Sequence, residues 1–185
     1  MTLHGEYLYR LGPWSDIRAE MPLLYEAAAC YPQVKVLELG VRTGNSTVAF
    51  LAAAEEAGGH VWSVDLEPPH APQDQWTGSG RWTFIQGDDL KIAPLEETPG
   101  VPLRPDVLFI DTSHEYDHTL AELRRYVPLV AEGGVVLMHD TLLTWDHREY
   151  RVAEALDTFC AETGLSWTEL SEGRYGLGEI RKPGG

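Results

Sequence analysis

Acidic and imidazole side chains stand where short apolar runs of this sequence end. Asp65 and Asp111 each close such a run, and His139 and Asp140 follow the run Gly134–Met138. Carboxylates and imidazoles can accept hydrogen bonds from ribose hydroxyls, ligate divalent cations or take up a substrate proton. Because the carboxyl ends of neighbouring parallel strands share one edge of a sheet, we expect binding and proton transfer at that edge.

A glycine-containing turn joins the first apolar run to a helix-forming segment. From Glu38 to Thr47 the chain reads E-L-G-V-R-T-G-N-S-T. Glycines permit a tight turn and a close approach of backbone to a ligand, and Asp65 at the end of the second run can accept both hydroxyls of a ribose. A dinucleotide fingerprint would need glycines where the chain has Arg42 and Asn45. An NAD(P)-dependent oxidoreductase is therefore kept only as an alternative.

Apolar runs alternate with segments of helical period, which predicts an α/β domain with a mainly parallel sheet. We expect helices over residues 15–30, 45–57, 119–130 and 149–163. We expect seven strands, over residues 34–39, 61–65, 82–86, 106–111, 134–138, 166–170 and 175–180, the last two forming an antiparallel hairpin. The proline-rich stretch 67–80 is expected to be a surface loop.

Length and charge limit the classes of protein to consider. The 185 residues fit one domain, residues 1–185, with residues 1–30 as an N-terminal helical cap. The net charge of −15 disfavours nucleic-acid and anionic membrane partners, and no apolar run approaches the roughly 20 residues of a membrane helix. Cys30 and Cys160 are expected to be packing thiols. We expect a soluble, cytoplasmic protein.

Taken together, the strand-end motifs resemble those of class I S-adenosyl-L-methionine (SAM) dependent methyltransferases. The turn at Glu38 is similar to their E/D-x-G-x-G-x-G motif, with Arg42 in place of the middle glycine. F-I-D-T-S-H-E-Y from Phe109 and G-G-V-V-L-M-H-D from Gly133 resemble a branch of macrocin and novobiocin-type sugar O-methyltransferases and cephalosporin-hydroxylase-like proteins. This closer resemblance covers residues 34–141.

The resemblance implies a three-layer, Rossmann-like fold that binds SAM. It places adenine contacts at Asp88 and Asp89, after the third strand. The cofactor-binding residues that we expect are Glu38, Gly40, Arg42, Gly44, Asn45, Ser46, Asp65, Leu66, Asp88, Asp89 and Asp111.

The same resemblance implies a metal site and a base. In the antibiotic-sugar enzymes Mg²⁺ is held by acids whose positions fall here on Asp111, His139 and Asp140. Imidazole suits softer cations than Mg²⁺, so Mn²⁺ and Zn²⁺ are candidates beside Mg²⁺. Those relatives have an aspartate as base where this chain has Ser113, so we expect His114, with Asp111, to be catalytic. Two alternatives stay open: the carboxylates cap strand ends, or they contact substrate without metal.

A cluster that combines a cation with a base suits a hydroxyl acceptor, because an alcohol attacks a methyl group poorly until it loses its proton. We therefore expect O-methylation of a small molecule, a sugar or a natural-product intermediate. An accessory protein that binds SAM without turnover is the alternative, and the chain is expected to form homodimers. Aromatic residues expected to cover the acceptor are Tyr7, Tyr9, Trp14, Trp76 and Trp145.

Overall fold

A single twisted sheet runs through the molecule in the order β3-β2-β1-β4-β5-β7-β6. The structure is a computed structural model that describes residues 2–70, 73–92, 104–143 and 150–185. The strands are β1 (Lys35–Leu39), β2 (His60–Asp65), β3 (Trp82–Gln86), β4 (Val107–Ile110), β5 (Val135–His139), β6 (Trp167–Glu169) and β7 (Leu177–Arg181). The helices are α1 (Leu3–Arg10), α2 (Met21–Ala29), α3 (Asn45–Ala57), α4 (Asp74–Gly78), α5 (Tyr116–Tyr126), η2 (Val127–Leu129, a 3₁₀ turn) and α6 (Val152–Thr163).

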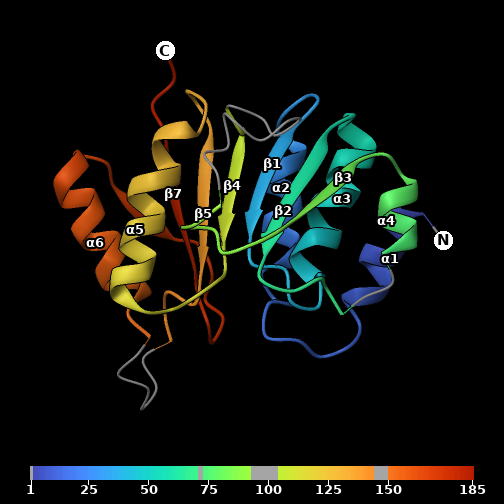
Figure 1. The fold of residues 1–185 in the computed structure, drawn as a ribbon, viewed down its shortest axis with the longest axis horizontal. Helices are drawn as coiled ribbons and strands as arrows, with labels where there is room; N and C mark the ends of the chain where they lie inside the picture. The colour runs from blue at the N-terminus through green and yellow to red at the C-terminus, as the bar shows by residue number, and fades with distance from the viewer. Residues whose placement is uncertain (1, 71–72, 93–103, 144–149) are drawn as a thin grey trace.

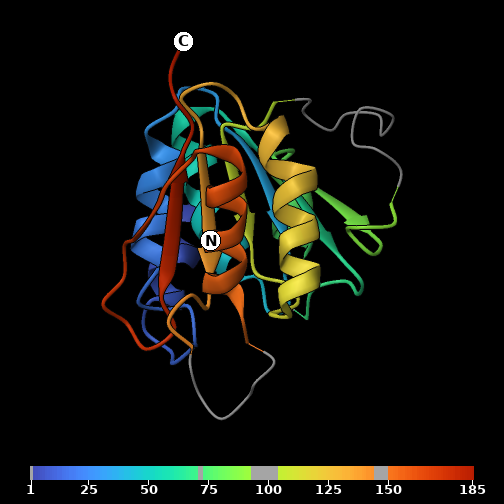
Figure 2. The ribbon, with the colours of Figure 1, turned by 90° about the vertical axis from the view of Figure 1, so that its left-hand side faces the viewer.

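Helices cover both faces of the sheet, which gives three layers (Figure 2). Helices α1, α2 and α3 pack on one face and α5 and α6 on the other. The central strand β4 is buried on both sides, as its unbroken apolar run Val107–Ile110 predicts. Two apolar cores result, one containing Phe50 and Phe109 and the other Leu108 and Tyr126.

Strands β1 to β5 are parallel, and their carboxyl ends meet at the lower edge in Figure 1. The order of strands reverses at β1, which pairs with β2 on one side and with β4 on the other. Strand β7 runs antiparallel between β5 and β6. The predicted fold class, a mainly parallel seven-stranded sheet with an antiparallel C-terminal hairpin, is therefore confirmed. None of the helices in the described ranges is long and apolar enough to cross a bilayer.

Three expectations about helices were wrong. The helix predicted from residue 15 begins at Met21, because Pro22 fits the first helical turn, and the separate helix α1 precedes it. The proline-rich stretch contains α4 and the fully buried Trp76, so it is not simply a surface loop. The helix predicted from residue 119 begins at Tyr116 and tightens into a 3₁₀ turn at Pro128.

A candidate ligand pocket beside an acid and imidazole cluster

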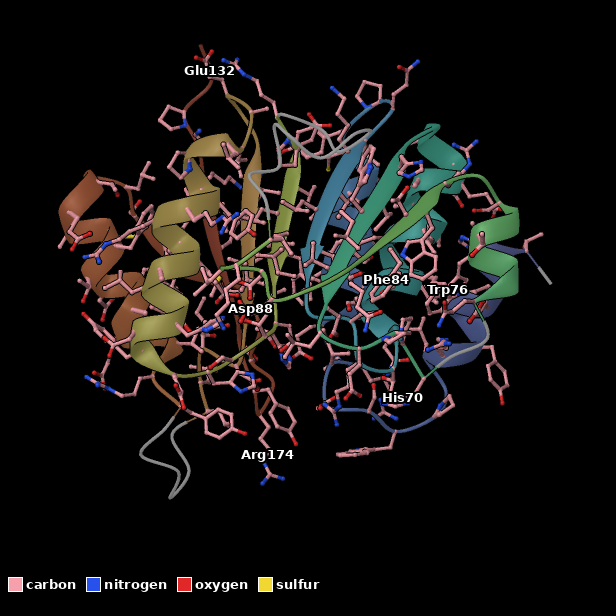
Figure 3. All side chains as sticks on the ribbon, in the orientation of Figure 1. His70, Trp76, Phe84, Asp88, Glu132 and Arg174 are labelled. Carbon is pink, nitrogen blue, oxygen red and sulfur yellow. The ribbon has the colours of Figure 1, made fainter. Side chains whose placement is uncertain are left out.

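A pocket of about 370 Å³ lies at the carboxyl ends of β1, β2, β3 and β4. Its volume is in the usual range for small-molecule sites. The predicted residues that line it are Gly40, Arg42, Asp65, Leu66, Asp88, Asp89 and Asp111. Figure 3 shows Asp88, His70 and Arg174 toward this edge and Glu132 at the opposite one. Four aspartates face one arginine and one histidine in the wall, so the pocket is suited to a cationic ligand.

Four residues predicted to contact the cofactor do not line the pocket: Glu38, Gly44, Asn45 and Ser46. The Asn45 side chain accepts from Arg10 and donates to Thr43. Glu38 is fully buried and accepts hydrogen bonds from Ser46 at 2.6 Å, Thr47 at 2.8 Å and Ser63 at 2.5 Å. The structure thus does not place these four residues in the pocket wall, and their contact with the cofactor stays a prediction.

The two motif glycines make room for protein atoms. A Cβ on Gly40 would lie 2.0 Å from the Asp111 carbonyl oxygen, and one on Gly44 would lie 2.2 Å from the Trp76 ring. Both glycines have positive φ, 88° and 74°. Arg42 stands where the related motif has its middle glycine and also has a positive φ, 50°. The chain therefore keeps a left-handed turn here and accepts the strain of a side chain in it.

The Asp65 carboxylate connects the end of β2 to this turn. Its Oδ2 accepts from the backbone amides of Val41 at 2.7 Å and Arg42 at 3.1 Å. Its Oδ1 accepts from the Glu67 amide at 3.3 Å. Asp65 thus fixes the loop that forms the pocket wall while its own side chain lies in that wall.

Four predicted side chains converge at the ends of β4 and β5. His114 Nε2 lies 2.7 Å from Asp140 Oδ2 and 3.6 Å from Asp111 Oδ1. His139 Nδ1 lies 3.5 Å from Asp111 Oδ1 and 3.4 Å from Asp140 Oδ2. We call these residues the Asp111 cluster. Asp140 has a φ of 62°, a left-handed conformation that aspartate tolerates better than most residues.

Charges within the Asp111 cluster shift its pKa values strongly. Burial alone would lower the pKa of each imidazole, but Asp111 and Asp140 outweigh it and raise the pKa of His114 to about 9 and that of His139 to about 11. Burial alone would raise the pKa of Asp111, but the two imidazoles hold it well below its usual value. Near neutral pH the cluster therefore contains ionised carboxylates and protonated imidazoles.

The Asp111 cluster has the composition of a cation site. Asp111, His139 and Asp140 each present a ligand atom within 4.8 Å of the others. His139 is 2% exposed, and neither of its ring nitrogens has a hydrogen-bond partner among the described residues. A buried imidazole that makes no hydrogen bond, beside two carboxylates, fits a divalent cation that accepts nitrogen and oxygen ligands.

Sequence reasoning missed six pocket residues: Val41, Val64, Gly87, Thr112, Ser113 and His118. His118 is the informative one. It pairs with Asp89, which lies far from it in the sequence, and with Glu122, which lies one helical turn further along α5. The helical spacing of His118 and Glu122 is the signal that was available.

The aromatic cover is only partly as expected. Tyr9 and Trp14 are exposed, but Tyr7 is buried in the core and Trp76 packs on Gly44, so these two were wrongly assigned to the acceptor surface. Trp145 lies outside the described residues. Tyr150 stacks on His114 with ring centroids 4.6 Å apart, and Tyr175 stacks on His139 at 6.0 Å.

Solved structures share this fold across nearly the whole chain. Cofactor-bound Rv0187 from MTB aligns with a TM-score of 0.73 and 19% identity, covering 99% of this chain and 90% of that one. The O-methyltransferase TomG from Streptomyces achromogenes, in complex with SAM, aligns with a TM-score of 0.72 and 18% identity, covering 98% and 86%. The sheet and layers are therefore those of the Rossmann-like methyltransferase fold.

Sequence comparison adds a family. The O-methyltransferase ankF of Aspergillus thermomutatus is 26% identical over 113 residues, 58% of this chain and 46% of that protein. The chain thus spans about half the length of this curated relative. A family described as "Methyltransferase domain" matches residues 37–141, from β1 to the residue after Asp140. Because that match covers more than half of the sequence and contains most of the pocket wall, the chain belongs to this methyltransferase family.

Proposed function

We propose that this chain transfers a methyl group from SAM to a hydroxyl group of a small molecule. Asp111 carries the proposal, because it lines the pocket and also belongs to the cluster of His114, His139 and Asp140. A donor in the pocket would therefore lie beside groups that can orient an acceptor and receive its proton. The curated relative ankF, named as an O-methyltransferase, supports an oxygen acceptor.

The charge of the pocket supports SAM as the ligand. SAM supplies a methyl group on a positively charged sulfur, and Asp65, Asp88, Asp89 and Asp111 would attract that charge and the donor's ammonium group. The same aspartates would repel the pyrophosphate of a nicotinamide dinucleotide. The turn after β1 favours SAM over a nicotinamide dinucleotide as well, because it has Arg42 and Asn45 where a dinucleotide-binding motif has glycines.

The proposed reaction is an in-line displacement. The oxygen lone pair of the acceptor forms the new bond to carbon, the electron pair of the broken bond goes to sulfur, and the hydroxyl proton goes to a base. His114 accepts that proton only as a neutral imidazole, a form that is favoured when a cation replaces protons at the cluster. Asp111 and Asp140 orient the imidazole and the acceptor.

We include a divalent cation in the proposal, held by Asp111, His139 and Asp140. When bound, it would lower the pKa of the acceptor hydroxyl. The imidazole of His139 in this ligand set favours Zn²⁺ or Mn²⁺ over Mg²⁺. A sugar or natural-product intermediate as acceptor, a cytoplasmic location and a homodimer remain predictions of the sequence.

The first test is calorimetric titration of the protein with S-adenosylhomocysteine. We expect binding by the wild type that Asp65→Ala weakens by at least about tenfold, because the substitution removes a pocket carboxylate and frees the turn at Val41. Asp106→Ala is the matched control: Asp106 also accepts a backbone amide, that of Lys35, but at the opposite edge of the sheet.

Three outcomes separate the candidate functions. Wild-type protein that fails to bind S-adenosylhomocysteine contradicts the proposal. Equal losses in Asp65→Ala and Asp106→Ala would mean that Asp65 acts only through stability. Binding without methylation of any hydroxyl compound in a broad panel would favour the accessory protein.

A further inference from the structure

A second cluster of potential ligands lies in the pocket wall, away from the Asp111 cluster. Asp89 follows β3, and His118 and Glu122 lie one turn apart on the same face of α5. Asp89 is 7% exposed and Glu122 is fully buried, whereas His118 is partly exposed to the pocket. The proposed reaction uses neither His118 nor Glu122.

The distances in this cluster are longer than those of direct hydrogen bonds. His118 Nε2 lies 3.3 Å from Asp89 Oδ1 and 3.6 Å from Glu122 Oε1. A charge-assisted hydrogen bond would bring such atoms to about 2.7–2.9 Å. Within the described part of the chain, His118 Nε2, Asp89 Oδ2 and Glu122 Oε2 are buried without a hydrogen-bond partner. Polar atoms in this state indicate a missing partner.

Neighbouring cationic groups are engaged elsewhere. The Arg125 guanidinium donates to the carbonyl oxygens of Leu90 and Ile92, and Lys91 pairs with Asp88. The hydroxyl of Thr112 donates to Glu122 Oε1 at 2.5 Å and orients that carboxylate. Two buried carboxylates thus share a single imidazole. Burial, together with the neighbouring Asp89 carboxylate, raises the pKa of Glu122 to about 7, although His118 and Thr112 act against that rise.

We propose that Asp89, His118 and Glu122 bind a Zn²⁺ ion in the wall of the pocket. Each residue offers a ligand atom within 4.8 Å of the others. Ligand atoms about 2.0–2.1 Å from a tetrahedral ion lie about 3.3 Å apart, close to the two distances measured here. One imidazole with two carboxylates is a donor set that suits Zn²⁺ better than Mg²⁺ or Ca²⁺.

The position of the cluster indicates what such an ion would face. Asp89 and His118 both line the pocket, whereas Glu122 lies behind them. Three protein ligands leave the fourth position of a tetrahedral ion open, and here the pocket supplies the space for it. A molecule in the pocket would therefore meet the ion at the end of β3, on the opposite side of Asp111 from His139.

The test is a Zn²⁺ titration of chelator-treated protein against a chromophoric competitor, without any SAM analogue. We expect two sites in the wild type and one in an Asp111→Asn, His139→Gln double variant. Adding His118→Gln to the double variant should weaken the remaining site by at least about tenfold, since even outer-shell changes cost that much. His4→Gln is the matched control, because His4 belongs to an exposed pair with Glu56.

Each result decides the proposal independently of the Asp111 cluster. If the wild type binds a single Zn²⁺ ion, and this binding is lost in His118→Gln but kept in the double variant, the site at Asp89, His118 and Glu122 is supported and a Zn²⁺ site at the Asp111 cluster is contradicted. Unchanged stoichiometry and affinity in both His118→Gln and Glu122→Gln overturn the proposal, as does a wild type without any Zn²⁺ site. Co²⁺ absorption provides a second readout: the tetrahedral bands should persist in the double variant and disappear when His118→Gln is added to it. Melting curves verify that every variant is folded.

Discussion

At the scale of single residues, Glu38 shows how a buried carboxyl can organise a binding turn without entering the pocket. Its two oxygens accept from three hydroxyls, on Ser46, Thr47 and Ser63. Two of these belong to the first turn of α3 and the third to β2. Glu38 therefore ties the helix that follows the glycine turn to the centre of the sheet.

Glu38 should make stability depend on pH. Burial raises its pKa from the ordinary glutamate value of 4.5 to about 7, against the effect of its three hydrogen bonds. A raised carboxyl pKa stabilises the fold fully below about pH 4.5, and this contribution is lost as the pH rises through about 7. We expect Glu38→Gln to gain about 3 kcal/mol relative to wild type across this window. Urea unfolding at a series of pH values measures the difference, and a difference that stays constant with pH contradicts the assignment.

The sequence predicted single residues well wherever a strand end fixes them. Asp65, Asp111, His139 and Asp140 lie at one edge because apolar runs locate strand ends and parallel strands align them. It did not reveal the neighbours of Glu38 and Gly44, because Ser63 and Trp76 reach them through tertiary packing. A contact between elements has no local pattern to reveal it.

At the scale of elements, α1 and α4 support the glycine turn from behind. Arg10 at the end of α1 donates to the Thr43 carbonyl at 2.8 Å and to Asn45 Oδ1 at 2.9 Å. The Trp76 indole, from α4, donates to Glu6 Oε2 at 3.1 Å and lies against Gly44. Residues 1–30 were expected to form a helical cap, but α1 was not predicted as a separate helix, and α4, with only five residues, was not predicted at all.

Trp76→Phe should test this support. The substitution removes the indole donor and leaves a buried Glu6 oxygen without it, so we expect a loss of about 1–3 kcal/mol of stability. S-adenosylhomocysteine binding should weaken as well, because the ring position under Gly44 changes. Trp14→Phe is the matched control: Trp14 is 77% exposed, and we expect a change within about 0.5 kcal/mol. Equal effects of the two substitutions on denaturant unfolding would contradict the supporting role.

At the scale of the whole molecule, negative charge dominates. The chain has 29 acidic against 14 basic residues, and four aspartates line one pocket. Such an excess repels itself in the folded state and attracts cations to concave acidic surfaces. The fold class was predictable from the order in which apolar and helix-forming segments alternate along the chain. The position of β7 between β5 and β6 was not predictable, because strand pairing depends on segments that are far apart in sequence.

Salt should therefore stabilise this protein. Screening of the net charge of −15 on going from about 0.02 M to about 0.3 M NaCl should add roughly 1 kcal/mol, or about 2–4 °C in Tm for a chain of this size. Differential scanning calorimetry with NaCl and KCl, at constant pH, measures the shift. A Tm that falls with both salts would show that favourable ion pairs outweigh the net repulsion.

The place of β7 in the sheet has a consequence for the order of events during folding. His139 ends β5 one residue beyond the pairing of that strand with β4, and it pairs with Leu177 of β7, a strand that arrives after α6 and β6 along the chain. Non-local pairings of this kind form late, because loop closure has to precede them. The parallel half of the sheet, with Asp65 and the glycine turn, can assemble first. The methyl-donor side of the pocket should thus mature before the Asp111 cluster does.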